Sequence, residues 1–277
     1  PSLAGAVGRS VSLQSRAVAL SNSAYMPSQS GANGQRVDPS ALMAQAKQIG
    51  NAAAFDPDKV LEGLQKFVAK TGDLETGRAA LSDLAVLSKA TSTELDDMVD
   101  AAGDAANALG DTDNKGAKVK AVMGAIAAQG KEGAVEIKDL ARQMAKLGAS
   151  AGTFEGDPTK VIWQMGALAQ MSRKMGGSAS ATQAATSLGS FTNIYSKNAR
   201  LNAFTKFGVE TQGAGGKIRK PIEVIVDALR AASSDKFGGM KNFNRNMGEM
   251  VMDAGARRTT RGFETIFKEA GGGEEGI

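Results

Sequence analysis

Apolar residues recur at intervals of three and four along most of the chain, and this spacing predicts a succession of α-helices. Asp-Pro pairs at positions 38–39, 56–57 and 157–158 mark three helix starts, with the aspartate as N-cap and the proline as the first helical residue. No segment alternates apolar and polar residues over a convincing length. The pattern therefore predicts an all-α protein.

The helices are expected to be short to medium in length and arranged in hairpins with Gly-rich breaks. Each of the 34 glycines costs about 1 kcal/mol relative to alanine inside a helix, which argues against long continuous helices. Strands are expected only in a small β-hairpin near residues 209–219. The predicted helices span residues 38–50, 56–70, 74–89, 94–109, 117–129, 135–147, 157–171, 178–195, 201–207, 221–229 and 240–270.

Composition divides the chain into three parts. Residues 1–37 contain no acidic residue and are rich in Ser, Ala and Gly, which predicts a disordered or extended arm. A targeting segment, or an end created by cloning, is the alternative interpretation of this part. Residues 38–235 are predicted to form one helical domain, and residues 236–277 a C-terminal helical segment with a frayed end.

The overall composition narrows the classes of chemistry. The chain contains neither cysteine nor histidine, which excludes disulfides, thiol nucleophiles, the usual zinc sites and a histidine general base. Its formal net charge of +4 is compatible with contact to DNA or to an acidic surface but does not require either. No apolar run approaches the roughly 18 residues of a membrane-spanning helix.

The segment GVETQGAGGKIRKP, residues 208–221, has four glycines within nine residues and invites comparison with phosphate-binding loops. A nucleotide P-loop needs glycine at position 211 and a hydroxyl residue at 218, but the chain has Thr211 and Ile218. A dinucleotide fingerprint also fails at Ile218, where it needs glycine or alanine. We interpret the segment as a flexible turn or hairpin tip before a helix that begins at Pro221.

Acidic residues cluster at two predicted helix starts. Paired carboxylates can hydrolyse glycosides, but only in a cleft that gives them unequal environments. At a helix N-terminus, negative charge is instead favoured by the helix dipole, so we interpret both clusters as solvated faces. The first cluster consists of Glu94, Asp96, Asp97 and Asp100, of which Asp96 and Asp100 share a face, and the second of Glu136 and Asp139.

Three further groups have a structural and a functional interpretation. Methionines at helical spacing are expected in the core, with an adaptable binding surface as the alternative. The single tryptophan, Trp163, is expected to anchor the core. The densest basic group is expected to be a solvated face, with contact to DNA or an acidic lumen as the alternative. The methionines are Met165, Met171, Met175, Met240, Met247, Met250 and Met252; the basic residues are Lys241, Arg245, Arg257, Arg258 and Arg261.

Four segments resemble, in order, the conserved helical domain of phage tail tape measure proteins. They are LAVLSKATSTELDDMVDAAGDAANAL (84–109), VEIKDLARQMAKLGASAGTF (135–154), and the segments 167–201 and 204–232. The resemblance is clearest at Phe207-Gly208-Val209, Gly216, Arg219 and the apolar pattern of 222–229, and it continues into the Gly- and Arg-rich segment 235–258. It covers somewhat over half of the chain. The chain departs from the family in its short length and in its loop, where the usual acidic residue is replaced and Glu210 lies nearby but displaced.

The resemblance implies a structural protein of the virion that is made in the cytoplasm of the bacterial host. Such proteins occupy the lumen or tip of the tail tube, set tube length during assembly and leave during DNA ejection. The implied partners are the tail tube protein, the tail tip or baseplate hub proteins, the tail assembly chaperones and further copies of the chain in a coiled-coil trimer. Non-specific DNA proximity and contact with the host membrane on ejection are also implied.

No catalytic, cofactor-binding or metal-ligating residues are predicted, so we expect no enzyme activity and no cofactor. Two other classes of function remain as alternatives. A soluble helical binding or effector module is the first, with residues 1–37 as its address. A peptidoglycan-degrading tail enzyme is less favoured, because it needs a deep cleft with a buried carboxylate.

Overall fold

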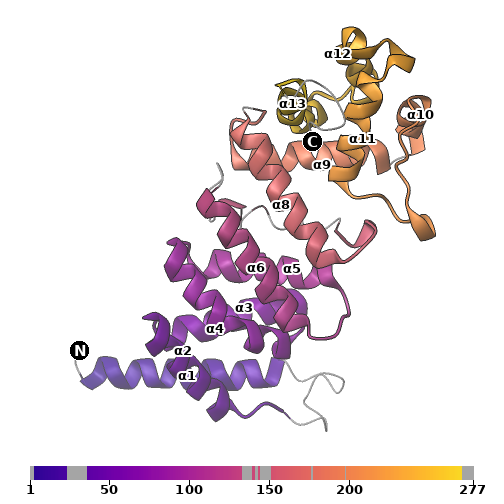
Figure 1. The fold of residues 1–277 in the computed structure, drawn as a ribbon. Helices are drawn as coiled ribbons and strands as arrows, with labels where there is room; N and C mark the ends of the chain where they lie inside the picture. The colour runs from indigo at the N-terminus through magenta and orange to yellow at the C-terminus, as the bar shows by residue number, and fades with distance from the viewer. Residues whose placement is uncertain are drawn as a thin grey trace. The chain divides into compact units, whose positions relative to one another are not determined.

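The protein is all-α in a computed structural model that describes residues 3–23, 36–132, 139–140, 143, 151–175, 177–196 and 198–269. Within these residues the chain forms twelve α-helices and three single 3₁₀ turns (Figure 1). This confirms the predicted fold class. Contacts divide the chain into two compact units, Pro1–Gly124 and Ala125–Ile277, a boundary that differs from those predicted at residues 37 and 235.

The first unit is built around α3 (Pro57–Thr71), which packs against four other helices of the unit. Its buried stripe of Val60, Leu61, Leu64 and Phe67 follows helical spacing, and each of these side chains is almost completely buried. The surrounding helices are α1 (Leu3–Ser23), α2 (Pro39–Ala53), α4 (Leu74–Thr91) and α5 (Leu95–Leu109), and α6 (Lys115–Glu132) begins in this unit.

Aspartate side chains fix three of the helix starts as the sequence predicts. Asp38, Asp56 and Asp157 each accept a hydrogen bond at 2.9 Å from the backbone N–H two residues later, and a proline occupies the next position in each case. Each cap satisfies one of the N–H groups that a helix start leaves without an intrahelical partner.

The prediction of an arm without regular structure is wrong for Leu3–Ser23, which forms α1. Leu13, Ala17 and Leu20 lie one helical turn apart and are buried, in a helix that packs against α2 and α3. Arg16 also donates to the Asp58 carboxylate, with 3.2 Å between Nε and Oδ1. Contacts with distant residues therefore order a segment whose own composition favours disorder. Residues 1–2 and 24–35 of the predicted arm lie outside the described residues.

The second unit is organised around α9 (Ala181–Ser196), which packs against α8 (Pro158–Lys174), α10 (Asn198–Lys206) and α13 (Ala254–Glu269). The remaining helices are α11 (Pro221–Ser233) and α12 (Gly239–Met250). Its core contains Val161, Ile162, Phe191, Val224 and Phe243, all almost completely buried.

Most predicted helices agree with the observed ones to within a few residues. The helix predicted over residues 240–270 is two helices, because the backbone leaves helical geometry at Val251 before Asp253 caps α13. Of the helix predicted over residues 135–147, only 139–140 and 143 are described, and they are helical. The frayed end predicted near residue 277 lies outside the described residues.

Candidate functional site

The glycine-rich turn, residues 208–221, begins where α10 ends. Gly208 has φ of 75°, in the left-handed region that favours glycine. Its N–H donates to the Thr205 carbonyl at 2.9 Å, and the Val209 N–H donates to the Phe204 carbonyl at 3.0 Å. These two bonds satisfy carbonyls that the helix end would otherwise leave unpaired, so Gly208 terminates the helix as predicted.

The predicted β-hairpin near residues 209–219 is reduced to one antiparallel bridge. Gln212 pairs with Ile218, and the Gly213 N–H donates to the Lys217 carbonyl at 2.8 Å. Ile218 also forms a parallel bridge with Phe154, which the sequence analysis did not predict. No strand forms among the described residues, because these pairings extend over too few residues.

Arg219 ties the glycine-rich turn to α11. Its Nη1 donates to the Glu210 carbonyl at 2.9 Å and to Asp227 Oδ2 at 2.7 Å, while Nε lies 3.8 Å from Glu223 Oε2. Burial alone would lower the pKa of Arg219, but the hydrogen bond to Asp227 and the charges of Asp227 and Glu223 raise it above its ordinary value. Arg219 therefore stays charged and holds the end of the turn on the helix that follows.

An aromatic cluster around Tyr195 contacts the glycine-rich turn. The Tyr195 ring lies among Phe154, Phe191 and Phe204, with ring centroids 5.3 to 6.5 Å apart. Such tilted and edge-on pairs are favourable aromatic geometries. The Tyr195 hydroxyl donates to the Arg219 carbonyl at 3.2 Å. Burial, followed by the negative charge of Glu223, raises the pKa of Tyr195 well above its ordinary value. The cluster thus joins the core of the second unit to the glycine-rich turn.

The turn does not form a phosphate cradle. A phosphate loop presents several free backbone N–H groups to the anion, but the Gly213 N–H is bonded within the turn. A Cβ added at Gly213 would lie 1.8 Å from Glu155 Oε2, so a carboxylate already occupies the space beside this glycine. The geometry agrees with the sequence interpretation of a turn and opposes an anion site.

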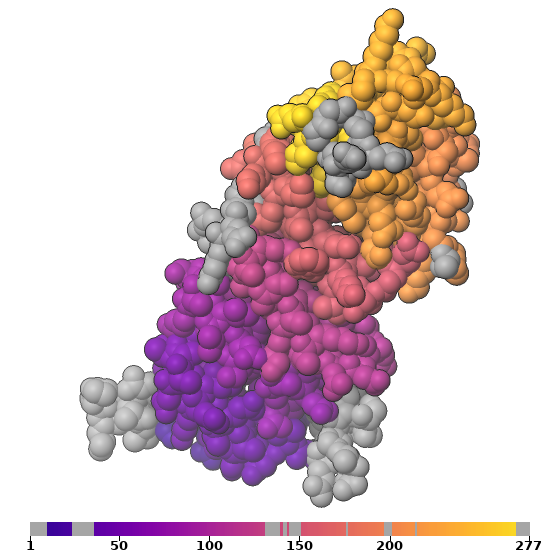
Figure 2. Space-filling view, in the orientation of Figure 1, coloured from indigo at the N-terminus to yellow at the C-terminus, as the bar shows by residue number. Residues whose placement is uncertain are grey.

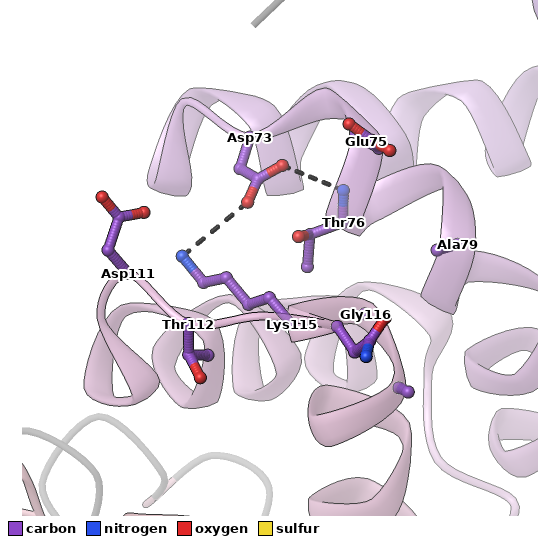
Figure 3. A pocket seen from close by; sticks show the side chains of 10 residues that line it. Asp73, Glu75, Thr76, Ala79, Asp111, Thr112, Lys115 and Gly116 are labelled. Carbon is purple, nitrogen blue, oxygen red and sulfur yellow. Dashed lines mark hydrogen bonds and ion pairs between the residues drawn. The ribbon is translucent and has the colours of Figure 1, made fainter. Parts of the chain in front are cut away.

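A polar pocket of about 400 Å³ lies in the first unit, where α4 and α6 begin (Figure 3). Asp73 acts twice there: Oδ1 accepts from the Thr76 N–H at 2.9 Å, and Oδ2 lies 3.7 Å from Lys115 Nζ. Glu75 and Asp111 also line the pocket. The pocket therefore has carboxylates and an ammonium group together. Through its two contacts, Asp73 fixes the start of α4 and the start of α6.

The two roles of Asp73 can be separated by substitution. Asp73→Ala is expected to lower the free energy of unfolding by about 1–2 kcal/mol, because it removes the helix cap and the ion pair. Asp73→Asn keeps a capping oxygen and should lower it by at most about 1 kcal/mol, the range of ion pairs near the protein surface. Chemical denaturation followed by circular dichroism measures both. Equal losses in the two variants would contradict the capping role.

Comparison with known families gives a match for this chain. The sequence model of the phage-related minor tail protein family matches residues 43–250, which include the pocket, the aromatic cluster and the glycine-rich turn. The chain belongs to this family. No curated protein and no solved structure matches this minor tail protein.

The acidic residues of α5 form ion pairs with α3. Lys66 Nζ lies 3.9 Å from Asp96 Oδ2 and 3.1 Å from Asp100 Oδ2. Lys70 Nζ lies 2.7 Å from Asp104 Oδ1. Asp96 and Asp100 therefore share a face, as predicted, and this minor tail protein uses that face to pair two helices. Asp97 lies in the first turn of α5, Glu94 is its N-cap residue, Asp139 is helical, and Glu136 lies outside the described residues.

The prediction that Trp163 anchors the core is wrong, because its side chain is 48% exposed. The buried face of α8 contains Val161, Ile162, Met165, Leu168 and Ala169. At 100° per residue, position 163 falls on the other side of the helix.

The methionines of this minor tail protein divide between core and surface. Met165, Met247 and Met250 are almost completely buried, as predicted. Met171 is half-buried, whereas Met175, Met240 and Met252 are exposed.

The described residues show neither a metal site nor a membrane span. No group of three or more acidic side chains is placed to hold a metal ion in this part of the chain. None of its helices is both long and apolar enough to cross a bilayer.

Proposed function

We propose that this minor tail protein is a tail tape measure protein that occupies the lumen or tip of the tail tube. It sets tube length during assembly and leaves the tube when DNA is ejected. The observation that carries the proposal is the family match over residues 43–250. The tape-measure pattern of residues 204–232 falls inside that match and coincides with the glycine-rich turn.

The proposed mechanism is that of a ruler. A helix advances about 1.5 Å per residue, so tube subunits that polymerise around a protein of fixed length stop at a fixed distance. The longest described helix has 21 residues, and the helices of each unit fold back on one another. The two units therefore suit the compact, tip-proximal or initiating part of a ruler better than its straight part.

The proposal includes partners at both ends of the tube. The tail tube protein surrounds the chain, the tip or baseplate hub proteins hold its folded units, and tail assembly chaperones keep it competent before the tube forms. Self-association as a trimer accommodates the chain in a symmetric tube, and contact with the host membrane follows ejection.

We also infer that the protein has a structural and not a catalytic role. The only fully buried carboxylate among the described residues belongs to Glu264, which is 5% exposed. It accepts from Thr260 Oγ1 at 2.8 Å and lies 3.3 Å from Arg257 Nη1. Its oxygens already contact groups of its own helix and its side chain is buried, so it does not face a cleft where a glycan could reach it. Clearing of peptidoglycan by the purified protein would contradict this inference.

The ruler is tested by changing the gene in a phage and measuring tails by electron microscopy. An in-frame tandem duplication of residues 43–250 adds 208 residues while keeping an intact copy of every helix in that range. We expect longer tails, with an upper limit of about 310 Å if the added copy were one straight helix. A smaller increase is expected if the copy folds into compact units.

An in-frame deletion within the gene provides the opposite test and should shorten the tails. The unmodified phage, grown and stained in parallel, supplies the reference length. Tails that assemble at unchanged length in both variants would rule out the ruler.

A further inference from the structure

The exposed sides of α12 and α13 carry basic residues, and the two helices touch where Lys268 of α13 reaches Asn244 of α12. On α12, Lys241 and Arg245 lie one turn apart and are exposed; on α13, Arg258 and Arg261 are exposed and also lie one turn apart. We call these four residues, together with Lys268, the cationic face. Figure 2 shows the gold and yellow residues of this region at the surface of the second unit.

Lys268 joins the two helices at this surface. Its Nζ donates to Asn244 Oδ1 at 2.8 Å and lies 4.9 Å from the centre of the Phe243 ring. Beneath it, the Phe243 and Phe267 rings stack with their centroids 5.7 Å apart. These contacts hold the last turn of α13 against α12.

Three of the nearby acidic groups are already engaged elsewhere. Glu249 pairs with Lys206, and Glu264 is buried against Arg257. Asp253 caps α13 by accepting from the Ala256 N–H at 2.8 Å. Two other acidic groups among the described residues are exposed: Glu269 in the last turn of α13 and Asp235 before α12.

The four basic side chains of the cationic face other than Lys268 remain unneutralised. None of them forms an ion pair with another described residue. Their positive charge therefore faces the solvent.

The charge of the whole chain is also unevenly divided. Residues 125–277 contain 21 Lys and Arg against 15 Asp and Glu, a formal net charge of +6. Residues 1–124 contain 12 Lys and Arg against 14 Asp and Glu, a formal net charge of −2. The cationic face thus lies in the unit whose overall charge also attracts anions.

We propose that the cationic face binds the phosphate backbone of DNA without sequence preference. Arginine and lysine that neutralise phosphates release counterions, which drives such binding. The face lacks aromatic side chains that would stack on bases, so it fits the regular phosphates of a duplex better than single strands.

An anionic lipid surface fits the cationic face less well than DNA. Most apolar residues of α12 and α13, such as Met247 and Phe267, are buried in the second unit and are not available for insertion into lipid. Met240 in α12 and Met252 after it are exposed, but isolated exposed apolar residues are common on protein surfaces.

The experiment measures binding of the full chain to a fluorescently labelled duplex of random sequence by anisotropy, over a series of salt concentrations. The test variant combines Lys241→Gln, Arg245→Gln, Arg258→Gln and Arg261→Gln. We expect its affinity to fall by about tenfold or more at low salt. The slope of log K against log salt should flatten by about 0.9 for each phosphate contact that is lost.

A matched control separates the cationic face from net charge. Lys47→Gln, Lys59→Gln, Lys160→Gln and Lys217→Gln also remove four exposed positive charges, so both variants lower the formal net charge from +4 to zero. The control should retain most of the affinity and the salt slope. All substituted side chains are exposed, so circular dichroism should show the native helix content in both variants.

Three results would overturn the proposal. The first is a control variant that binds DNA as weakly as the test variant, because net charge would then explain the binding. The second is an unmodified protein without salt-dependent DNA binding. The third is binding to anionic vesicles without binding to DNA. None of these measurements involves tail length. A negative result for DNA binding would therefore not contradict the tape-measure proposal, and unchanged tail lengths would not contradict DNA binding.

Discussion

Replacing Tyr195 with alanine is expected to lower the free energy of unfolding of the second unit by about 3–5 kcal/mol, the range for buried aromatic residues. The side chain is 1% exposed and lies among three phenylalanine rings, so its removal leaves a cavity that the cluster cannot fill. The Arg219 carbonyl also loses its hydrogen bond from the hydroxyl. Denaturant unfolding followed by the fluorescence of Trp163, the single tryptophan, reports on this unit.

Tyr195→Phe is the matched control, since it keeps the ring and removes only the hydroxyl. It should lower the free energy of unfolding by about 1–3 kcal/mol, the penalty for a partly buried carbonyl left without its partner. Similar losses in the alanine and phenylalanine variants would contradict the packing of the aromatic cluster.

The burial of the Tyr195 hydroxyl is tested by the pH dependence of stability, compared between the unmodified protein and Tyr195→Phe. The pKa of Tyr195 is raised in the folded protein, first by burial and then by the charge of Glu223. The unfolded chain therefore loses this proton first, near the ordinary pKa of 10.0. The stabilising contribution of Tyr195 is complete below that pH and declines above it. Tyr195→Phe should lose less stability than the unmodified protein over this alkaline range.

Local chemistry explains which parts of the fold the sequence predicts. Asp56 and Asp157 act on N–H groups two residues away, so an Asp-Pro pair contains its own evidence for a helix start. The helix α1 was missed because its buried stripe, Leu13, Ala17 and Leu20, is short and is stabilised by packing against distant helices. Such contacts between distant helices cannot be predicted from composition alone.

The sequence likewise predicts some features of the candidate site and not others. Thr211 and Ile218 exclude a phosphate loop from the sequence alone, because the motif specifies residue types at fixed spacing. The bridge between Ile218 and Phe154 and the hydrogen bond from Tyr195 to the turn join residues far apart in the chain. No periodicity predicts such pairs. The basic residues of α12 and α13 were identified from the sequence, but the contact between the two helices at Lys268 depends on packing.

Gly177→Ala is expected to destabilise the second unit by about 1–3 kcal/mol, because the site has no room for a methyl group. A Cβ at this buried position would lie 2.3 Å from the Arg258 carbonyl oxygen and 3.1 Å from the Ser172 carbonyl oxygen. Both are backbone atoms, so relief requires α13 to move away from the segment that follows α8. Thermal unfolding and denaturant unfolding measure the loss.

Gly189→Ala is the control, because Gly189 lies inside α9 with nothing within 4 Å of an added Cβ. There alanine should stabilise the protein by about 0.5–1 kcal/mol, since glycine loses more conformational freedom in a helix. The two substitutions add the same atom and should have opposite signs. A neutral Gly177→Ala would show that α13 does not approach this close. It would also remove the support that this contact gives to the placement of Arg258 on the cationic face.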